Sequence, residues 1–383
     1  MKAAFKREIG RLGSTWTYLV GMILIPLAVA LFFVDLLDAG LPQRLPTSIV
    51  DLDHSTMSRQ IRRTLDSNQF VNITDVAESY DEALEQVRKG QVYGFFVIPA
   101  NFQADAVGGR KPTLEYYTNM TYFVSGTLAF KGFKSVAVTT SGGMLKTTLT
   151  AVGIPDNMAG GLLTPVIIDI NPLNNPWMNY SAYMAPSYVM ATFVLMIMLM
   201  TVYAITGEIK HGTSVRWLKA NNGSVIRALF TKLLPHTVIY IAVAFGILWM
   251  FFCWQHFPLN GSLAWVLTAT VLLVVASQAF AVIVCSLIPN PRFAYSMCAL
   301  FGVLTYSFGG FSFPVENMYG AVAIFSWFAP VRYWYLIYIN EALNGVALFY
   351  SRWFFAALLI FPLLSLIPVL RLKKALLNPV YVP

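Results

Sequence analysis

Long apolar runs alternate with shorter polar segments along most of the chain. A helix needs about 20 predominantly apolar residues to cross a bilayer. Stretches without Asp, Glu, Lys or Arg that approach or exceed this length fall at 12–34, near 185–206, across 233–291, at 293–315 and at 353–370. The third is long enough for two spans, divided by the polar turn "WQHFPLNGS". The pattern therefore predicts six transmembrane helices, at 16–35, 181–206, 231–254, 262–288, 293–313 and 352–371.

Region 36–180, between the first two predicted spans, follows a different pattern. Strand-like segments alternate in it with helix-like ones. In "HSTMSRQIRRTLDSN", for example, Met57, Ile61 and Leu65 recur at four-residue spacing, which favours a helix. The predicted strands are "PTSIVDLD", "QFVNITDV", "QVYGFFVIP" and "PTLEYYTNM", and a long helix follows from Tyr122 to about Val152. This alternation predicts a compact α/β domain inserted into an α-helical polytopic membrane protein.

The composition supports a membrane protein. The chain is 57% hydrophobic and 11% charged, with a mean hydropathy of +0.62, whereas soluble domains are about 45–50% apolar and about 25% charged. The three cysteines lie inside apolar runs without metal-ligand spacing, so they are predicted to be small buried hydrophobes. No metal site is expected.

The distribution of charge predicts the orientation. With the N-terminus inside, the inner segments carry 13 basic and two acidic residues, whereas region 36–180 carries 11 basic and 13 acidic ones. The whole basic excess behind the net charge of +8 thus lies on one side, as the positive-inside rule requires. Both termini are therefore predicted to be cytoplasmic and region 36–180 to be extracytoplasmic. No nucleic-acid partner is needed to explain the basic charge.

Region 36–180 offers little catalytic chemistry. Asp51 and Asp53 with His54 could suggest a metal site or a hydrolase, but a strand end followed by a helix cap, with Ser55 or Asp53 capping, explains them better. The segment "GGMLKTT" resembles a phosphate-binding loop only faintly, because that loop requires glycine directly before the lysine and Leu145 stands there. No catalytic residue and no nucleotide site is predicted.

Two basic segments on the predicted inner side suggest docking. In "GEIKHGTSVRWLKANNGS", Gly212 permits a sharp bend and Thr213 is predicted to cap a short helix. Trp217 and Leu218 would then form an exposed apolar tip for a partner, since Trp is favoured in interface hot spots; the alternative places Trp217 at the lipid interface. In the N-terminal helix, 1–15, the predicted lipid-facing residues are Ala4, Phe5, Ile9 and Leu12, and the predicted headgroup-binding ones are Lys2, Lys6, Arg7 and Arg11. The alternative for this helix is a generic positive flank.

Several segments together resemble a known family. They are "IVDLDHSTMSRQIRRTL", "VRKGQVYGFFVIPANF", "NPWMNYSAYMAPSYVMA", "GEIKHGTSVRWL" and "FSFPVENMYGAVAIFSWFAPVRYWY". In this order, covering nearly the whole chain, they resemble the permease subunit of a type-2 ATP-binding-cassette (ABC) exporter with a large periplasmic domain after the first helix. The fourth is similar to the family's E-x-E-x-G-T segment, although Lys210 replaces the second acid and Val215 and Arg216 stand where an acid is common.

The resemblance implies a division of labour. A separate ABC ATPase subunit would carry ATP and Mg, with no cofactor on this chain. A second permease copy or a homologous permease would complete the pathway in a bacterial inner membrane. The periplasmic domain would meet a periplasmic adaptor and an outer-membrane channel, or gate the exit. It also implies that 314–350 is a re-entrant hairpin, followed after the last span by a cytoplasmic tail, 372–383.

The expected site residues follow from this division. The ATPase-coupling residues lie in segment 207–230 and are Glu208, Lys210, His211, Gly212, Thr213, Arg216, Trp217 and Leu218. The inner-surface helix contributes Lys6, Arg7 and Arg11 beside the ATPase. The outer gate is assigned to Phe313, Pro314, Pro330 and Arg332.

The expected function is ATP-driven export of a hydrophobic or amphiphilic substrate, such as a drug or a lipid-like molecule. One alternative is an ion-coupled secondary transporter. Such proteins need ionisable residues within the membrane, whereas Asp35, Glu316 and Glu341 lie at or beyond the outer edges of the predicted spans. Another alternative is a membrane receptor or assembly factor that transports nothing.

Overall fold

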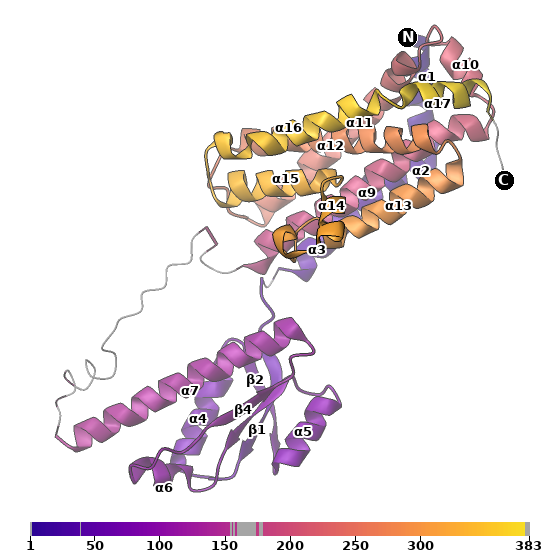
Figure 1. Cartoon of the computed structure of the whole chain (residues 1–383). Helices are drawn as coiled ribbons and strands as arrows, with labels where there is room; N and C mark the ends of the chain where they lie inside the picture. The colour runs from indigo at the N-terminus through magenta and orange to yellow at the C-terminus, as the bar shows by residue number, and fades with distance from the viewer. Residues whose placement is uncertain are drawn as a thin grey trace. The chain divides into compact units, whose positions relative to one another are not determined.

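The computed structural model describes residues 2–38, 40–153, 155, 158, 174–175 and 179–379. The chain divides into two compact units. The first comprises Met1–Gly40 with Pro172–Pro383, and the second comprises Leu41–Asn171. The first unit is helical, and the second contains the β-strands described below (Figure 1).

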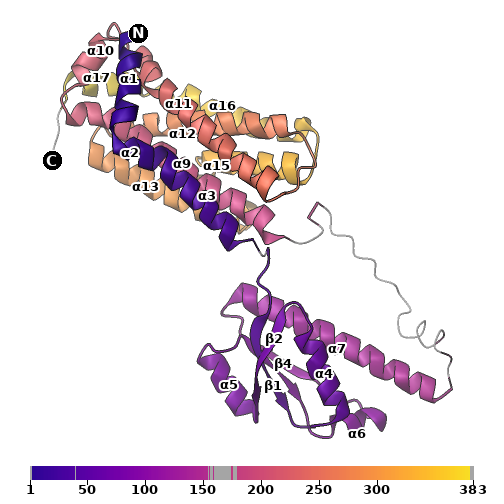
Figure 2. The same ribbon diagram turned by 180° about the vertical axis from the view of Figure 1, so that it is seen from behind.

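The first unit is a bundle of long apolar helices. Its elements are α1 (Lys2–Ser14), α2 (Trp16–Leu19), η1 (Val20–Leu24), α3 (Ile25–Leu36), α9 (Tyr180–Lys210), α10 (Ser214–Lys219), α11 (Val225–Trp249), η2 (Met250–Trp254), α12 (Leu263–Leu287), α13 (Pro291–Phe308), η3 (Val315–Asn317), α14 (Gly320–Ser326), α15 (Pro330–Tyr338), η4 (Ile339–Leu343), α16 (Leu348–Ser365) and α17 (Val369–Leu377). Seen from behind, α1, α2 and α3 run as one path along the bundle (Figure 2).

Five helices in the described residues are long and apolar enough to cross a membrane. They are Trp16–Leu36, Tyr180–Lys210, Val225–Trp254, Leu263–Leu287 and Leu348–Leu377. A sixth candidate is the bent pair Gly320–Ser326 and Pro330–Leu343, whose halves meet at 81°. The predicted span 293–313 corresponds to α13, which ends at Phe308 and is not among the five. Tyrosines, serines and an arginine near its start make it less apolar than its neighbours.

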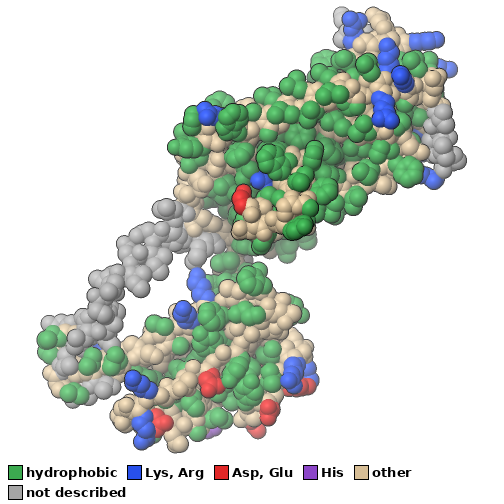
Figure 3. Space-filling view, in the orientation of Figure 1, with side chains coloured by type: hydrophobic (Ala, Val, Ile, Leu, Met, Phe, Trp, Pro, Cys, Tyr) green, Lys and Arg blue, Asp and Glu red, His purple; other side chains and the backbone are tan. Residues whose placement is uncertain are grey.

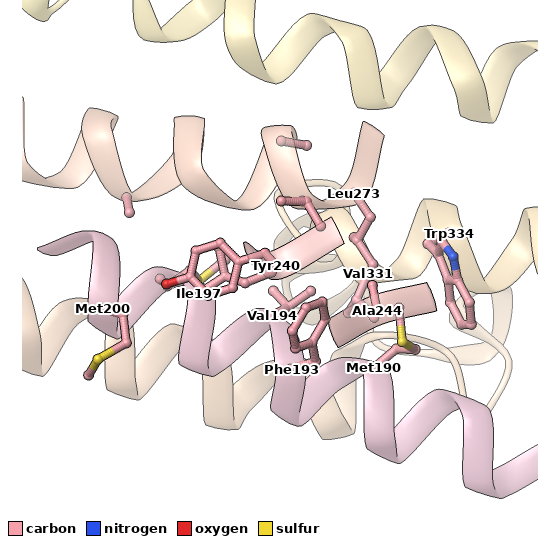
Figure 4. Close-up of a cluster of buried hydrophobic side chains, with 14 of the residues drawn as sticks. Met190, Phe193, Val194, Ile197, Met200, Tyr240, Ala244, Leu273, Val331 and Trp334 are labelled. Carbon is pink, nitrogen blue, oxygen red and sulfur yellow. The ribbon is translucent and has the colours of Figure 1, made fainter. Parts of the chain in front are cut away.

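Helix α9 forms the centre of this unit. Of its most apolar window, 72% is buried, against 17% for Leu348–Leu377 at the periphery. Its side chains meet those of α11, α12 and α15 in one continuous core (Figure 4), which includes Met190, Phe193, Val194, Ile197, Tyr240, Ala244, Leu273, Val331 and Trp334. Some buried polar groups in the core are paired, as in the 2.8 Å bond that the Trp334 indole N–H donates to Thr270 Oγ1, whereas others, among them the Tyr335 hydroxyl, have no hydrogen-bond partner in the described part of the chain.

The second unit contains a small mixed sheet with helices on both faces. Its elements are β1 (Leu45–Asp51), α4 (Thr56–Asp66), β2 (Val71–Ala77), α5 (Tyr80–Arg88), β3 (Gly94–Ile98), α6 (Phe102–Val107), β4 (Glu115–Thr118) and α7 (Phe123–Ala151). The strand order is β2-β1-β3-β4, with β1 parallel to β2 and β3 and with β4 antiparallel to β3. This arrangement agrees with the predicted alternation of strands and helices.

Alternating side chains on β1 and β3 supply the two cores of the sheet. Ile49 and Phe96 pack with residues of α4 and α7, whereas Val50 and Phe95 pack against α5. At the end of β1, Asp51 accepts hydrogen bonds from two backbone amides and from a serine hydroxyl, and Ser55 caps α4. The acids at this strand end therefore stabilise a turn, in agreement with the structural explanation.

Candidate functional site

A cluster of charged side chains is buried at the end of the bundle where α1, α9 and α11 meet. We name Arg7, Glu8, Arg11, Glu208 and Lys232 the ionic cluster. The Lys232 ammonium lies 3.0 Å from Glu8 Oε2 and 2.9 Å from Glu208 Oε1. The Lys232, Glu208 and Glu8 side chains are 0%, 1% and 2% exposed. Three cations thus share two carboxylates; Lys232 and both glutamates are buried, whereas Arg7 and Arg11 are 42% and 25% exposed.

Two arginines of α1 complete the coordination of Glu208. The guanidinium of Arg7 donates a 2.8 Å hydrogen bond and that of Arg11 a 3.0 Å hydrogen bond to Glu208 Oε1. Their four-residue spacing puts both side chains on one face of the helix. Arg7 and Arg11 thus bind a buried carboxylate, although their side chains stay 42% and 25% exposed; that they also meet lipid headgroups stays a prediction. Lys6 is exposed, as expected.

Such a cluster adds little net free energy to folding, but it opposes the separation of the helices that carry its members. The desolvation of two buried ions offsets most of their attraction, but removing one partner costs about 3–5 kcal/mol because an unpaired charge stays buried. The described residues of α1, α9 and α11 are therefore difficult to separate at this end.

Segment 207–230 turns sharply beside the cluster. Gly212 has a φ of +64°, the left-handed conformation that its sequence position suggested. Thr213 precedes α10 but makes no capping bond through its side chain. Its hydroxyl instead donates to Glu208 Oε2. The prediction of a Thr213 cap is thus wrong, since the carboxylate competes successfully for this hydroxyl.

Trp217 and Leu218 of α10 are buried, which corrects the prediction of an exposed apolar tip. The Trp217 side chain is 1% exposed, and its ring lies 5.0 Å from the Lys232 ammonium, a cation–π geometry. The indole is buried because it packs over Lys232 of the ionic cluster. The lipid-interface alternative for Trp217 fails for the same reason. The local sequence, with basic residues on both sides of Trp217 and Leu218, does not indicate the contact with Lys232.

Further hydrogen bonds fix α10 to its neighbours. The Asn221 amide donates to the Trp217 carbonyl at 2.9 Å and accepts from the Thr231 hydroxyl of α11 at 3.0 Å. Ser214 donates to the Leu376 carbonyl of α17 at 2.7 Å. The short helix is therefore attached to α11 and α17 by buried polar contacts.

The exposed side chains of this end are basic. Lys210, His211, Arg216 and Lys219 all face solvent on segment 207–230. Figure 3 shows Lys and Arg side chains gathered at the end of the helical unit where α1, α10 and α17 lie. The exposed surface of this segment is therefore basic, and Trp217 is buried below it.

Sequence reasoning missed three members of the site. Glu8 and Lys232 entered the interpretation only as terms of the charge balance, and His236 was assigned no role. The His236 Nδ1–H donates to the Lys232 carbonyl at 2.8 Å, and its Nε2 lies 3.8 Å from Glu8 Oε1. One signal was present: Glu8 is the single acid before Asp35 in a strongly basic N-terminal segment.

The proposed outer-gate residues lie elsewhere in the helical unit. Phe313 and Pro314 are exposed in the loop before η3, whereas Pro330 is buried at the start of α15. The Arg332 guanidinium donates to Ser326 Oγ at 3.2 Å, across the bend between α14 and α15. Arg332 therefore stabilises the bent pair.

Comparison with known families identifies the class of protein. Residues 14–370 match the model of the ABC-2 family transporter proteins. The chain therefore belongs to the ABC-2 family, the membrane components of ABC transporters, and this confirms the resemblance to a type-2 permease. No curated protein matches the chain. Among the described residues, no group of three or more His, Cys, Asp and Glu side chains could hold a metal ion.

Proposed function

We propose that this chain is the permease subunit of an ATP-driven exporter that moves a hydrophobic or amphiphilic molecule out of the cytoplasm or the inner leaflet. Hydrolysis would take place on a separate ATPase subunit. The family supports a transporter membrane component. The observation that carries the proposal is the ionic cluster, because it connects the surface segment 207–230 to two membrane-crossing candidates.

The connection suggests how force enters the bundle. A partner that pushes on α10 displaces Thr213, which is bonded to Glu208 on α9, and Trp217, which covers Lys232 on α11. Because protein interiors are close-packed and transmit strain, such a push moves α1, α9 and α11 together. The Ser214 bond extends the movement to α17.

The exposed basic residues are the proposed docking surface for the ATPase. Lys210, Arg216 and Lys219 would meet acidic side chains, which steer association and fix the register of the two chains. This surface replaces the buried Trp217 as the expected point of contact. Lys210, which departs from the family pattern, then belongs to the same basic surface.

The topology belongs to the same proposal. The basic end of the helical unit would face the cytoplasm, as the positive-inside rule predicts. Unit Leu41–Asn171, with its four-stranded sheet, would be the periplasmic α/β domain and would meet an adaptor and an outer-membrane channel. A second permease copy in the bacterial inner membrane would complete the pathway.

Reconstitution tests the proposal. The chain and its ATPase would be placed together in liposomes, and ATP hydrolysis and the release of a fluorescent amphiphile would be measured. Both activities should require both subunits. The charge-reversed variant Arg216→Glu with Lys219→Glu should weaken ATPase binding about tenfold or more, as expected for a charged interface.

The matched control for this experiment is Lys111→Glu. Lys111 is also exposed but lies in the second unit, so its reversal should leave ATPase binding unchanged. Unaltered binding of the Arg216→Glu, Lys219→Glu variant would contradict the docking surface. ATP hydrolysis without any release of amphiphile would contradict export.

A further inference from the structure

An apolar groove opens on the surface of the helical unit between α11, α12 and the α16–α17 region. Its volume is about 330 Å³, at the lower end of the range of about 300–1,000 Å³ that is typical of small-molecule sites. Phe230 and Leu234 of α11 and Leu366 after α16 form exposed parts of its wall. No Asp, Glu, Lys or Arg lines it, so a charged molecule would lose its hydration there without compensation.

One polar side chain in the groove lacks a partner. Gln278 of α12 is 4% exposed and lines the groove. Its Oε1 accepts a 2.7 Å hydrogen bond from Thr237 Oγ1, whereas its Nε2 has no partner among the described residues. The Thr237 hydroxyl can bond either end of a carboxamide. The end of the amide that points away from Thr237 has no partner among the described residues.

Buried polar groups are nearly always hydrogen-bonded, so an unpaired amide beside a groove indicates a missing ligand atom. A hydroxyl group fits this position best, because it can donate to the amide oxygen or accept from the amide nitrogen. The rest of the lining suits a hydrocarbon body. The chemistry of the site is therefore that of an uncharged, mostly apolar molecule that carries a hydroxyl.

The depth of Gln278 excludes an ordinary phospholipid as the source of that group. Gln278 precedes the end of α12 at Leu287 by nine residues, or about 13.5 Å at a rise of about 1.5 Å per residue. The hydrocarbon core is about 30 Å thick. With α12 crossing the membrane and Leu287 at its boundary, Gln278 would lie deeper than the ester groups that border the core.

We infer that this groove binds an uncharged hydroxyl-bearing amphiphile that enters sideways from the membrane. Its hydrocarbon part packs between α11, α12 and α16, and its hydroxyl bonds the Gln278 amide. The groove shares α11 with the ionic cluster, since this helix carries both Lys232 and Thr237. That the bound molecule is cargo rests on the proposed function; that it binds does not.

Photolabelling tests the binding site. The full chain in phospholipid vesicles would be exposed to diazirine-tagged dodecanol or to diazirine-tagged dodecane, and the labelled peptides would be identified by mass spectrometry. A single added hydrogen bond should favour labelling of α11, α12 and α16 by the alcohol about fivefold. In Gln278→Leu this preference should vanish while labelling by the alkane stays the same. The unchanged alkane signal shows that the groove has kept its shape.

Two further variants complete the test. Ala279→Phe places a large side chain in the groove and should abolish labelling there by both probes. Gln255→Leu, a matched control beyond η2 and outside the groove, should retain the preference for the alcohol. Equal labelling by both probes in the wild type, or labelling spread evenly over all lipid-facing helices, would overturn the site.

A final experiment distinguishes binding in the groove from transport of the bound molecule. With the ATPase and ATP present, occupancy by dodecanol should fall during turnover if the molecule is cargo. Selective labelling that turnover leaves unchanged would support the binding site and overturn the cargo role. Export that survives in Ala279→Phe would likewise overturn the cargo role while leaving the exporter assignment intact.

Discussion

The two ends of the helical unit each bury a glutamate, and they treat it in opposite ways. Glu208 contacts three cationic groups and the Thr213 hydroxyl. Glu341, in η4 at the other end, is 2% exposed, and the described residues offer its Oε1 no hydrogen-bond partner. Ion pairs fix the Glu208 carboxylate, whereas at Glu341 the hydrogen bonds are made by the neighbouring backbone.

The backbone around Glu341 is well anchored. Asn260 donates from its amide N–H to the Ala342 carbonyl at 2.8 Å and from its side chain to the Leu343 carbonyl at 2.7 Å. Gly261 packs so closely against the Glu341 carbonyl that a side chain there would collide with it. The comparison shows that burial alone does not define a coupling site. A link between helices requires partners on several elements, which Glu208 has.

The largest expected effect comes from removing the shared cation. Lys232→Met keeps the length of the side chain but leaves Glu8 and Glu208 buried without it. The free energy of unfolding should fall by about 3–5 kcal/mol, measured by denaturation in detergent. The control Lys111→Met removes an exposed lysine and should change it by less than about 0.5 kcal/mol. Equal effects of the two substitutions would mean that the cluster links nothing.

Glu208→Gln should have the next largest effect. The amide keeps the shape of the carboxylate but loses its charge, so the bonds from Arg7, Arg11 and Lys232 weaken together. A loss of about 2–3 kcal/mol is expected, as for hydrogen bonds to charged groups. ATP hydrolysis and amphiphile release in liposomes should also become uncoupled. Full coupling in this variant would refute the mechanical role of the cluster.

Thr213→Val tests the contact between the turn and the cluster. The substitution removes one hydroxyl donor to Glu208 while preserving the branched shape. We expect a loss of about 1 kcal/mol, visible as a small decrease in the midpoint of thermal unfolding. A loss as large as that of Glu208→Gln would show that Thr213 acts through something other than this hydrogen bond.

Glu341→Gln should have the smallest effect, and it sharpens the comparison. No ion pair of Glu341 occurs among the described residues, so stability should change by less than about 1 kcal/mol. ATP-driven release should persist. A variant that loses release while binding and hydrolysing ATP normally would instead give the buried carboxyl a role in transport, and dependence of wild-type release on a proton or sodium gradient would favour the ion-coupled alternative.

Much of the fold could be predicted from the sequence because hydrophobic periodicity reports it directly. Apolar runs such as 12–34 marked the membrane-crossing candidates, and the changed period in region 36–180 marked the strands β1–β4 and the helices around them. Helix α13 and the bent pair α14–α15 were harder. Helix α13 is not among the candidate spans, whereas the bent pair qualifies only when its two halves, which meet at 81°, are counted together.

The location of the candidate site was also predictable, since segment 207–230 is polar between two apolar runs. Its interior was not. Whether Trp217 points outward or inward depends on Lys232, which lies 15 positions further along the chain, and on Glu8, which lies more than 200 positions away. The same is true of Gln278, whose unpaired amide is visible only once α11 lies beside α12.

The sequence by itself determined that this is a helical membrane protein with a basic end and a smaller unit containing a sheet. These properties depend on local periodicity and composition, which any segment carries alone. Only the tertiary structure decided which charges are buried together, which side of Trp217 is covered and where a groove remains. Those properties depend on desolvation and pairing between distant segments, and the energy of a buried charge is fixed by its neighbours in space.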